Sequence, residues 1–241
     1  MTPIDIPTRE TCAFIASHLR PGAEILEVGC GEGHVARELA NSGYRVVGVD
    51  SDRAAVEQAQ ARGVRAMMAT WPDFDSPPVD AIAFTRSLHH INPLREALRR
   101  SRETVRPMGA LFVEDFAFDE ADEATVRWFL SVLRSPPAKA LLHPLPGAFL
   151  TSLLESSDPM AEWRRDHDHE LHTAPTMRGA IEEHFNVSET QRVPYLYRYL
   201  VPVLAEMPEA VAFIEDVLQE EMRLGRNGEI VLVGLRTVGV G

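Results

Sequence analysis

The chain has 241 residues, of which 45% are hydrophobic and 25% charged, enough for one α/β domain with a full core and room for a cap. Its net charge of −12 opposes nonspecific binding to phosphates, which disfavours nucleic acid as a partner. No run of 18 apolar residues occurs, the first five residues do not begin a signal peptide, and only two cysteines are present. We therefore expect no membrane partner and a cytoplasmic location.

Residues 25–33 are the most informative stretch of the chain. A short apolar run ends in the acid Glu27, a turn with Gly29, Gly31 and Gly33 follows, and a helical stretch comes next. A strand, a tight turn and a helix N-terminus in this order predict a pocket whose backbone N–H groups face a ligand. The third glycine comes one residue too early for a dinucleotide fold, and the Gly-Lys-Ser/Thr sequence of a P-loop is absent. A structural turn with incidental glycines is the alternative.

The acid-x-Gly-x-Gly-x-Gly form of this turn resembles motif I of the class I S-adenosylmethionine-dependent methyltransferases. The resemblance implies S-adenosyl-L-methionine as the cofactor and S-adenosyl-L-homocysteine as its product. The carboxylate of this cofactor suits the positive end of a helix, and its ammonium group suits a side-chain carboxylate. We therefore expect the turn to bind the cofactor through Glu27, Gly29, Cys30, Gly31 and Gly33.

The next two expected strands end in further candidate cofactor residues. Asp50 and Ser51 come at the carboxyl end of the first of these strands. Asp50 lies 21 positions after Gly29, and an acid at about this distance is placed to accept hydrogen bonds from both ribose hydroxyls. Asp50 could instead be the N-cap of the helix that starts three residues later. Thr70 and Trp71 follow the second strand, where related enzymes usually have an Asp that binds adenine. We expect the Thr70 hydroxyl to accept from the adenine amino group and Trp71 to pack on the ring.

Strand and helix patterns alternate from residue 24 to residue 115, which predicts βα units and a parallel sheet with right-handed connections. Further strands are expected over 45–49, 64–68, 79–85 and 110–114, and helices over 33–41, 53–62 and 93–105. The sequence Arg86-Ser87-Leu88-His89-His90 and a Pro-x-Gly before residue 110 resemble the same superfamily, and make Arg86 and Ser87 cofactor candidates. The resemblance implies an α/β, Rossmann-like fold. Its seven-stranded sheet is mostly parallel with an antiparallel last strand, and insertions add a largely helical cap.

Two long insertions interrupt this pattern in the second half of the chain. We expect a cofactor-binding core over 1–115, a cap over 116–178, and completion of the sheet over 179–241 with a second helical insertion over 194–226. The last strand is expected over 229–235. Connections this long are usually functional, and their apolar and aromatic content indicates a small, partly apolar methyl acceptor. Plain core packing is the alternative for any one of these aromatic residues.

Histidines and one acid are the candidate catalytic residues. A hydroxyl acceptor needs a general base with a pKa near neutrality, which histidine supplies. His90 is the first candidate because it follows a strand beside the expected methyl position, and the others are His89, Asp115, His169 and His172. His89 or His90 could instead close the cofactor pocket through backbone contacts. A carboxylate, phenolate or thiolate acceptor would need no base.

Residues 167–172 contain three histidines among carboxylates, but their spacing matches no standard zinc or iron site. We therefore expect no metal, and favour a position in the acceptor pocket or on the surface for these side chains. His143, in a proline-rich segment, is a candidate lid residue.

These features predict methyl transfer from S-adenosylmethionine to an oxygen or nitrogen of a small molecule. A tRNA or protein methyltransferase is one alternative, because Arg95, Arg99, Arg102 and Arg106 share one helix face, although a solvated face explains them as well. A protein that binds the cofactor without methylating is another. The stretch 85–88 lacks the Asp/Asn-Pro-Pro-aromatic motif of base-amine methyltransferases. The oligomeric state is not predicted.

Overall fold

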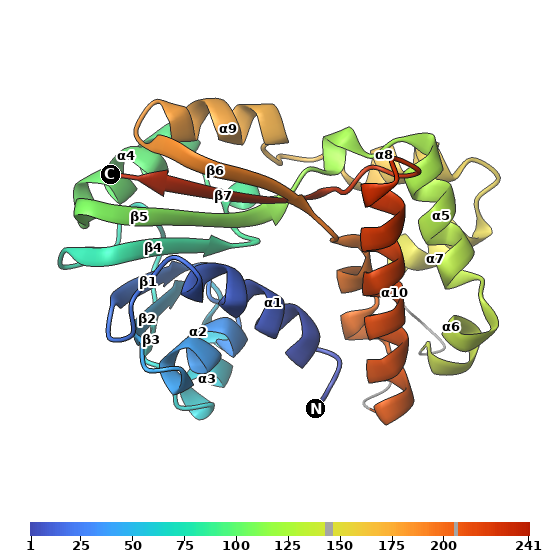
Figure 1. Cartoon of the computed structure of the whole chain (residues 1–241), viewed down its shortest axis with the longest axis horizontal. Coiled ribbons are helices and arrows are strands. Elements are labelled where there is room, and N and C mark those ends of the chain that lie inside the picture. The colour runs from blue at the N-terminus through green and yellow to red at the C-terminus, as the bar shows by residue number, and fades with distance from the viewer. Residues whose placement is uncertain (143–146, 205–206) are drawn as a thin grey trace. The chain divides into compact units, whose positions relative to one another are not determined.

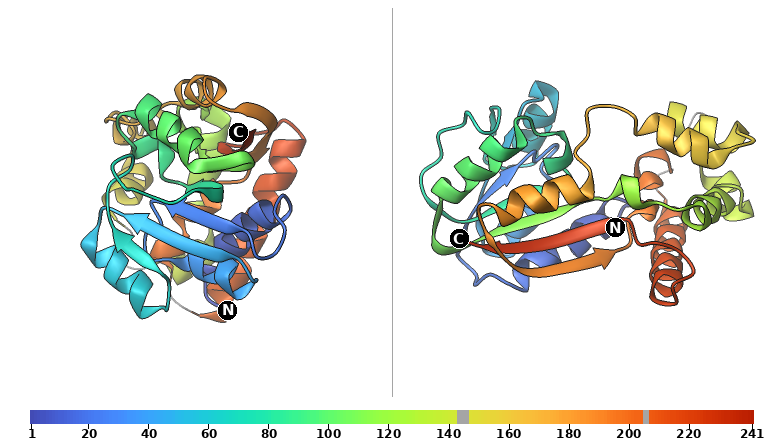
Figure 2. Two further views of the ribbon diagram at one scale, coloured as in Figure 1. Left: turned by 90° about the vertical axis from the view of Figure 1, so that its left-hand side faces the viewer. Right: turned by 90° about the horizontal axis from the view of Figure 1, so that it is seen from above.

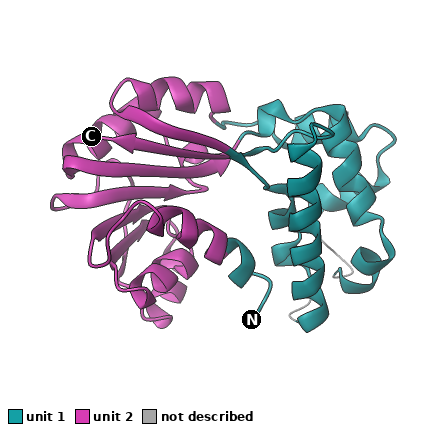
Figure 3. Ribbon diagram, viewed as in Figure 1, with its two compact units in different colours: residues 1–7, 117–171, 192–234 teal, residues 8–116, 172–191, 235–241 magenta. Residues whose placement is uncertain are grey.

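A computed structural model describes residues 1–142, 147–204 and 207–241. The chain divides into two compact units (Figure 3). Unit 1 comprises residues 1–7, 117–171 and 192–234, and unit 2 comprises residues 8–116, 172–191 and 235–241. His143, the candidate lid residue, lies outside the described residues. None of the helices among the described residues combines the length and the apolar composition that spanning a bilayer requires.

A seven-stranded sheet with the strand order β3-β2-β1-β4-β5-β7-β6 dominates unit 2 (Figure 1). Its strands are β1 (Glu24–Val28), β2 (Arg45–Asp50), β3 (Ala66–Met68), β4 (Val79–Thr85), β5 (Val105–Phe116), β6 (Asn186–Val193) and β7 (Gly234–Val240). The pairs β1–β2, β1–β4, β2–β3 and β4–β5 are parallel. Strand β7 is antiparallel to β5, because Gly241 at its end exchanges hydrogen bonds with Met108 and Gly109 near the start of β5. The α/β, Rossmann-like fold with an antiparallel last strand is confirmed.

Helices cover both faces of this sheet (Figure 2). The helices of unit 2 are α1 (Asp5–Ala16), whose first turn belongs to unit 1, α2 (His34–Asn41), α3 (Arg53–Ala61), η1 (Leu88–His90), α4 (Leu94–Thr104) and α9 (Ala174–Glu182). Ile25 of β1 packs with α1, α2 and α3, whereas its neighbour Leu26 packs with α4 and α9. Successive strand residues point to opposite faces, so a nearly continuous apolar run is what a doubly covered strand requires.

Unit 1 is largely helical. Its elements are η2 (Phe118–Glu120), α5 (Glu123–Leu133), α6 (Pro136–Leu141), α7 (Ala148–Glu155), α8 (Pro159–Asp166), η3 (Leu196–Tyr199), η4 (Val201–Val203) and α10 (Pro208–Arg226). Its core includes the fully buried rings of Trp163 and Tyr197. The buried carboxylate of Glu221 on α10 accepts from three successive backbone N–H groups, those of Tyr195, Leu196 and Tyr197. These bonds satisfy donors at the start of η3 that would otherwise be buried without a partner.

The last strand differs from the prediction. The sequence indicates a strand over 229–235, but β7 begins only at Gly234. The preceding residues bond within unit 1 instead: Val231 N–H donates to Thr125 Oγ1, and the carbonyl of Val233 accepts from Ala117 N–H. The apolar run from residue 230 to residue 233 therefore hydrogen-bonds to the first part of residues 117–171 before the sheet pairing begins. These residues, the segment of unit 1 between β5 and α9, form the 117–171 insertion.

Candidate functional site

The glycine turn after β1 needs its glycines for different reasons. All three have positive φ angles, 72° for Gly29, 52° for Gly31 and 79° for Gly33. A Cβ on Gly29 would lie 2.3 Å from Ser87 Cβ, and one on Gly33 would lie 2.9 Å from Ala59 Cβ, whereas one on Gly31 would meet no atom within 4 Å. Gly29 and Gly33 are thus required by close packing as well as by backbone conformation, and Gly31 by conformation alone.

The expectation that the turn presents its N–H groups to a ligand is wrong for most of them. The N–H groups of Gly29 and Cys30 both donate to the carbonyl of Val49, and that of Gly33 donates to the carbonyl of Cys30. The N–H of Gly31 donates to the carboxylate of Asp50. Buried donors must be paired, and here the neighbouring strand β2 provides the acceptors for three of these four N–H groups. The turn is therefore held by β2.

Asp50, at the end of β2, uses both carboxylate oxygens to organise the site. Oδ2 accepts from Gly31 N–H at 2.7 Å, and Oδ1 accepts from Asp52 N–H at 2.9 Å. The alternative that Asp50 caps the following helix is wrong, because the Asp52 side chain accepts from Ala54 and Ala55 as the N-cap of α3. Each Asp50 oxygen keeps a second lone pair, so the same carboxylate can also accept from ligand hydroxyls.

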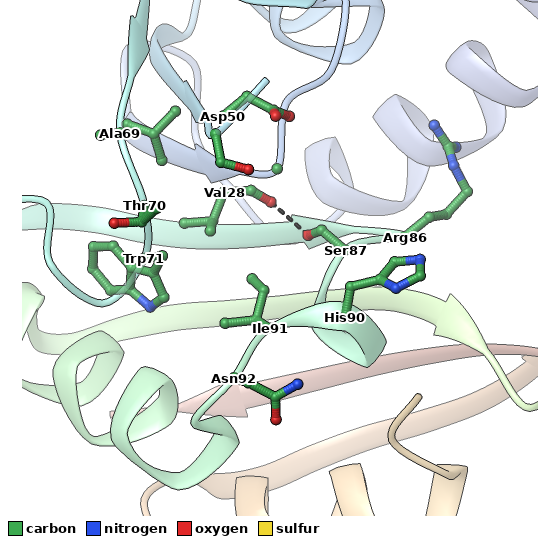
Figure 4. Close-up of a pocket in the computed structure, with 13 residues that line it drawn as sticks. Val28, Asp50, Ala69, Thr70, Trp71, Arg86, Ser87, His90, Ile91 and Asn92 are labelled. Carbon is green, nitrogen blue, oxygen red and sulfur yellow. Dashed lines mark hydrogen bonds between the residues drawn. The ribbon is translucent and has the colours of Figure 1, made fainter. Parts of the chain in front are cut away.

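A cavity of about 420 Å³ opens at the carboxyl ends of β1, β2, β3 and β4 (Figure 4). All of the residues that line it belong to unit 2. The lining includes seven of the predicted cofactor residues, namely Gly29, Asp50, Ser51, Thr70, Trp71, Arg86 and Ser87, and also His90. The sequence reasoning did not name five further lining residues, Val28, Val49, Ala69, Ile91 and Asn92. Four of these five adjoin a residue that was named, and the fifth, Asn92, follows Ile91 directly. Extending the prediction from the residues at strand ends to their immediate neighbours in the sequence would therefore have identified most of these lining residues.

The other four predicted cofactor residues do not line this cavity. Glu27 is only 1% exposed; Thr85 Oγ1 donates to its Oε1 at 2.6 Å, and its Oε2 has no hydrogen-bond partner in the described part of the chain. Burial raises the pKa of Glu27 to about 7 against the opposing effects of Thr85 and Arg86. Cys30 points into the core under Gly48, where a Cβ would lie 2.6 Å from its Sγ, and burial raises its pKa to about 12. A thiol with that pKa is not a nucleophile at neutral pH.

Thr70 and Trp71 form one wall of the cavity after β3 (Figure 4). Thr70 Oγ1 donates to the carboxylate of Asp73 at 3.0 Å, which leaves the hydroxyl oxygen as an acceptor. The indole of Trp71 is 6% exposed, and its Nε1 donates to the carbonyl of Ala97 on α4. The ring is therefore held in place by the core while it contributes to the wall.

Four of the five candidate catalytic residues lie together around η1. His90 lines the cavity and is exposed, whereas His89 is 7% exposed and its Nδ1 lies 2.5 Å from Asp115 Oδ1. The rings of His89 and His90 have their centroids 4.0 Å apart. His172 bonds to the same segment through its backbone N–H and its ring. His169, the fifth candidate, is an exposed residue of unit 1.

The histidine-rich stretch 167–172 contributes no metal site in the described residues, where no group of three or more His, Cys, Asp or Glu side chains could hold an ion. His167 lies in the aromatic core of unit 1. Its Nδ1 lies 2.7 Å from the carbonyl of Trp163, its Nε2 lies 2.9 Å from the hydroxyl of Tyr199, and its ring stacks on Phe118. Both ring nitrogens are thus engaged by protein groups.

The arginine face of α4 is largely neutralised by acids. Arg95 pairs with Glu183, Arg99 pairs with two glutamates of its own helix, and Arg106, just beyond the helix, pairs with Glu24 and Asp80. Cations that are already paired attract phosphates only weakly, so this face shows the pattern of a solvated surface.

Comparison with known proteins places the chain among methyltransferases. Residues 8–166 match a family model described as a methyltransferase domain. The chain is 23% identical over 189 residues to a ubiquinone biosynthesis O-methyltransferase from Alkalilimnicola ehrlichii, covering 74% of this chain and 73% of that protein. It is 32% identical over 123 residues to O-methyltransferase resE from Aspergillus sclerotiorum, covering 46% of each. Several curated relatives are matched over about half of their length or less.

Among solved structures, the chain resembles a geranyl diphosphate C-methyltransferase from Streptomyces coelicolor, determined with Mg²⁺, geranyl diphosphate and S-adenosyl-L-homocysteine. The TM-score is 0.59 at 13% identity, over 96% of this chain and 78% of that one. At this identity the similarity establishes the fold.

Proposed function

The chain belongs to the methyltransferase-domain family, within the class I S-adenosylmethionine-dependent superfamily, and from that premise we propose that it methylates an oxygen or nitrogen of a small, partly apolar molecule. The cavity at the carboxyl ends of the strands is the observation that carries this proposal, because it joins the Asp50 carboxylate to an exposed histidine, His90. Both curated relatives described above are O-methyltransferases, which favours oxygen as the acceptor atom.

The residues present fit S-adenosyl-L-methionine. Asp50 would accept from the ribose hydroxyls, while Thr70 and Trp71 would bind the adenine. Glu27, buried below the turn with one carboxylate oxygen lacking a hydrogen bond among the described residues, would balance the ammonium group, directly or through water. Such an orphaned buried oxygen is costly in a protein and is what a ligand cation or a bound water would compensate. When bound, the cofactor supplies an electrophilic methyl group on a sulfonium.

His90 is our candidate for the general base. It lies on the cavity wall, its ring contacts that of His89, and imidazole accepts protons at neutral pH. In this role it would take the proton from an acceptor hydroxyl as the oxygen–methyl bond forms. An acceptor that is already ionised would leave His90 only a positioning role, and replacing it would then affect acceptor affinity rather than the single-turnover rate.

We further propose that the two insertions, 116–178 and 194–226, act as the cap and supply the acceptor-binding residues. They contain most of unit 1, and this unit has a cluster of aromatic rings in Phe118, Phe149, Trp163, Tyr195 and Tyr199. Trp163 and Tyr195 are buried in the core of this unit, whereas Phe118, Phe149 and Tyr199 are partly exposed. Partly exposed aromatic rings bind small molecules that combine apolar rings with a polar group.

The test combines binding and turnover. Calorimetric titration with S-adenosyl-L-methionine and S-adenosyl-L-homocysteine should show binding to the wild type and much weaker binding to Asp50→Ala. A panel of phenols, hydroxylated aromatics, carboxylates and amines would then be screened for release of S-adenosyl-L-homocysteine. Turnover of one class supports the proposal. Cofactor binding without turnover of any small molecule, together with salt-sensitive methylation of tRNA or protein, would refute the small-molecule assignment.

A further inference from the structure

The segment from Ser87 to Ile91 is held by two residues that flank the 117–171 insertion. Asp115 lies two positions before the chain enters unit 1, and His172 is the first residue after the chain leaves it. Between them they make four hydrogen bonds to His89 and Ile91, all inside unit 2. Neither Asp115 nor His172 lines the cofactor cavity, but His90, between the two bonded residues, does.

Asp115 fixes His89. Its carboxylate is fully buried; Oδ2 accepts from the backbone N–H of His89 at 3.1 Å, and Oδ1 lies 2.5 Å from His89 Nδ1. Oδ1 also accepts from Phe116 N–H at 2.8 Å. Because an ionised carboxylate can only accept, Nδ1 of His89 must be the protonated nitrogen. One side chain therefore sets the backbone position, the tautomer and the ring plane of His89, against which the His90 ring packs.

His172 holds the same segment from the other side of the insertion. Its backbone N–H donates to the carbonyl of His89 at 2.9 Å, and its Nε2 lies 3.0 Å from the carbonyl of Ile91. A carbonyl only accepts, so Nε2 carries the proton in this bond. The two carbonyls flank His90, and both would otherwise have to find water at the edge of the site.

We propose that Asp115 and His172 are positioning residues that set His90 and Ile91 at the wall of the cofactor cavity. The importance of His90 rests on the function proposed above, but the positioning itself does not. The sequence placed both residues among the catalytic candidates; the geometry points to a supporting role, because each acts through His89 or through a backbone carbonyl. This supporting role also explains why Asp115 and His172 flank the 117–171 insertion. Their hydrogen bonds tie both ends of the insertion to the segment from Ser87 to Ile91, which carries the candidate base.

A matched pair of variants at His172 tests the proposal without knowledge of the acceptor. His172→Phe keeps a ring but removes the donor to Ile91, whereas the amide of His172→Gln can donate in its place. His184→Phe is the control, a histidine of unit 2 in the turn before β6. Two readouts are compared with the wild type: calorimetric affinity for S-adenosyl-L-homocysteine, and the imidazole ¹⁵N–¹H NMR signals of His89 and His90.

His172→Phe should bind S-adenosyl-L-homocysteine roughly five- to tenfold more weakly, the effect of one lost hydrogen bond at the cavity wall, and should shift the His90 signals. His172→Gln should stay within about twofold of the wild type, as should the control. Asp115→Leu removes both carboxylate acceptors at similar volume and should remove the signature of a protonated Nδ1 from His89. Unchanged affinity and unchanged His90 signals in His172→Phe would overturn the proposal. Because neither readout uses an acceptor, failure to find any methylated substrate would refute the proposed function while leaving this test intact.

Discussion

Replacing Glu27 with glutamine should abolish a pH dependence of stability that one buried carboxyl creates. Glutamine is nearly isosteric and can still accept the hydrogen bond from Thr85, but it cannot ionise. Burial raises the pKa of Glu27 from 4.5 to about 7 in the folded protein. The folded state therefore keeps a proton that the unfolded state releases, so the contribution of Glu27 to stability is complete below pH 4.5 and is lost as the pH rises to about 7.

The expected size follows from the two pKa values. The difference between pKa 4.5 in the unfolded chain and about 7 in the folded protein corresponds to about 3 kcal/mol over the whole window. Near pH 5.2 the chain carries no net charge and is least soluble, so the measurement is best made between pH 6 and pH 8. Over that interval the wild type should lose about 1.3 kcal/mol of unfolding free energy relative to Glu27→Gln.

Urea unfolding of both proteins without cofactor, at several pH values in this interval, measures the difference directly. Thr85→Val provides a second variant, because it removes the hydrogen bond that favours the ionised form of Glu27. In this variant the pKa of Glu27 should rise further, so the loss of stability should occur at higher pH than in the wild type. A difference between wild type and Glu27→Gln that stays constant from pH 6 to pH 8 would refute the reasoning. So would a difference that grows in favour of the wild type as the pH rises, since it would mean that the folded protein lowers this pKa.

Three further predictions concern the turn, the ribose contact and the arginine face. Gly29→Ala should lower the unfolding free energy by about 2–4 kcal/mol through strain and its collision with Ser87, whereas Gly31→Ala, which meets open space, should cost only about 1 kcal/mol in the same urea assay. Asp50→Asn should weaken S-adenosyl-L-homocysteine binding by roughly 10- to 100-fold in calorimetry, because charge-assisted bonds to the ribose are lost; an unchanged affinity would remove Asp50 from the cofactor site. Arg99→Ala should leave turnover of a small acceptor and its salt dependence unchanged, because this guanidinium is already paired with glutamates; a salt-dependent loss of turnover would favour a nucleic acid substrate.

The histidines show where sequence reasoning reached its limit. Their place after β4 follows from local patterns, but which of two adjacent histidines faces the cavity does not. The segment forms a 3₁₀ turn, in which successive side chains point about 120° apart, so His89 is buried against Asp115 while His90 reaches the cavity. Asp115 lies 26 positions from His89, and His172 lies 81 positions from Ile91, distances at which no sequence periodicity reports a contact.

The sequence by itself determined the strand–turn–helix order, the glycine spacing and the acids at strand ends, and with them the fold class; the cofactor followed from the resemblance of this pattern to the class I methyltransferases. These depend on local propensity and on the rule that parallel strands bring their carboxyl ends to one edge, so Asp50, Thr70 and Ser87 could be placed in advance. Only the tertiary structure showed which N–H groups of the turn donate hydrogen bonds to β2, and that Glu27 is buried with a raised pKa. Hydrogen-bond partners and burial are set by segments that pack from elsewhere in the chain, and no local pattern contains that information.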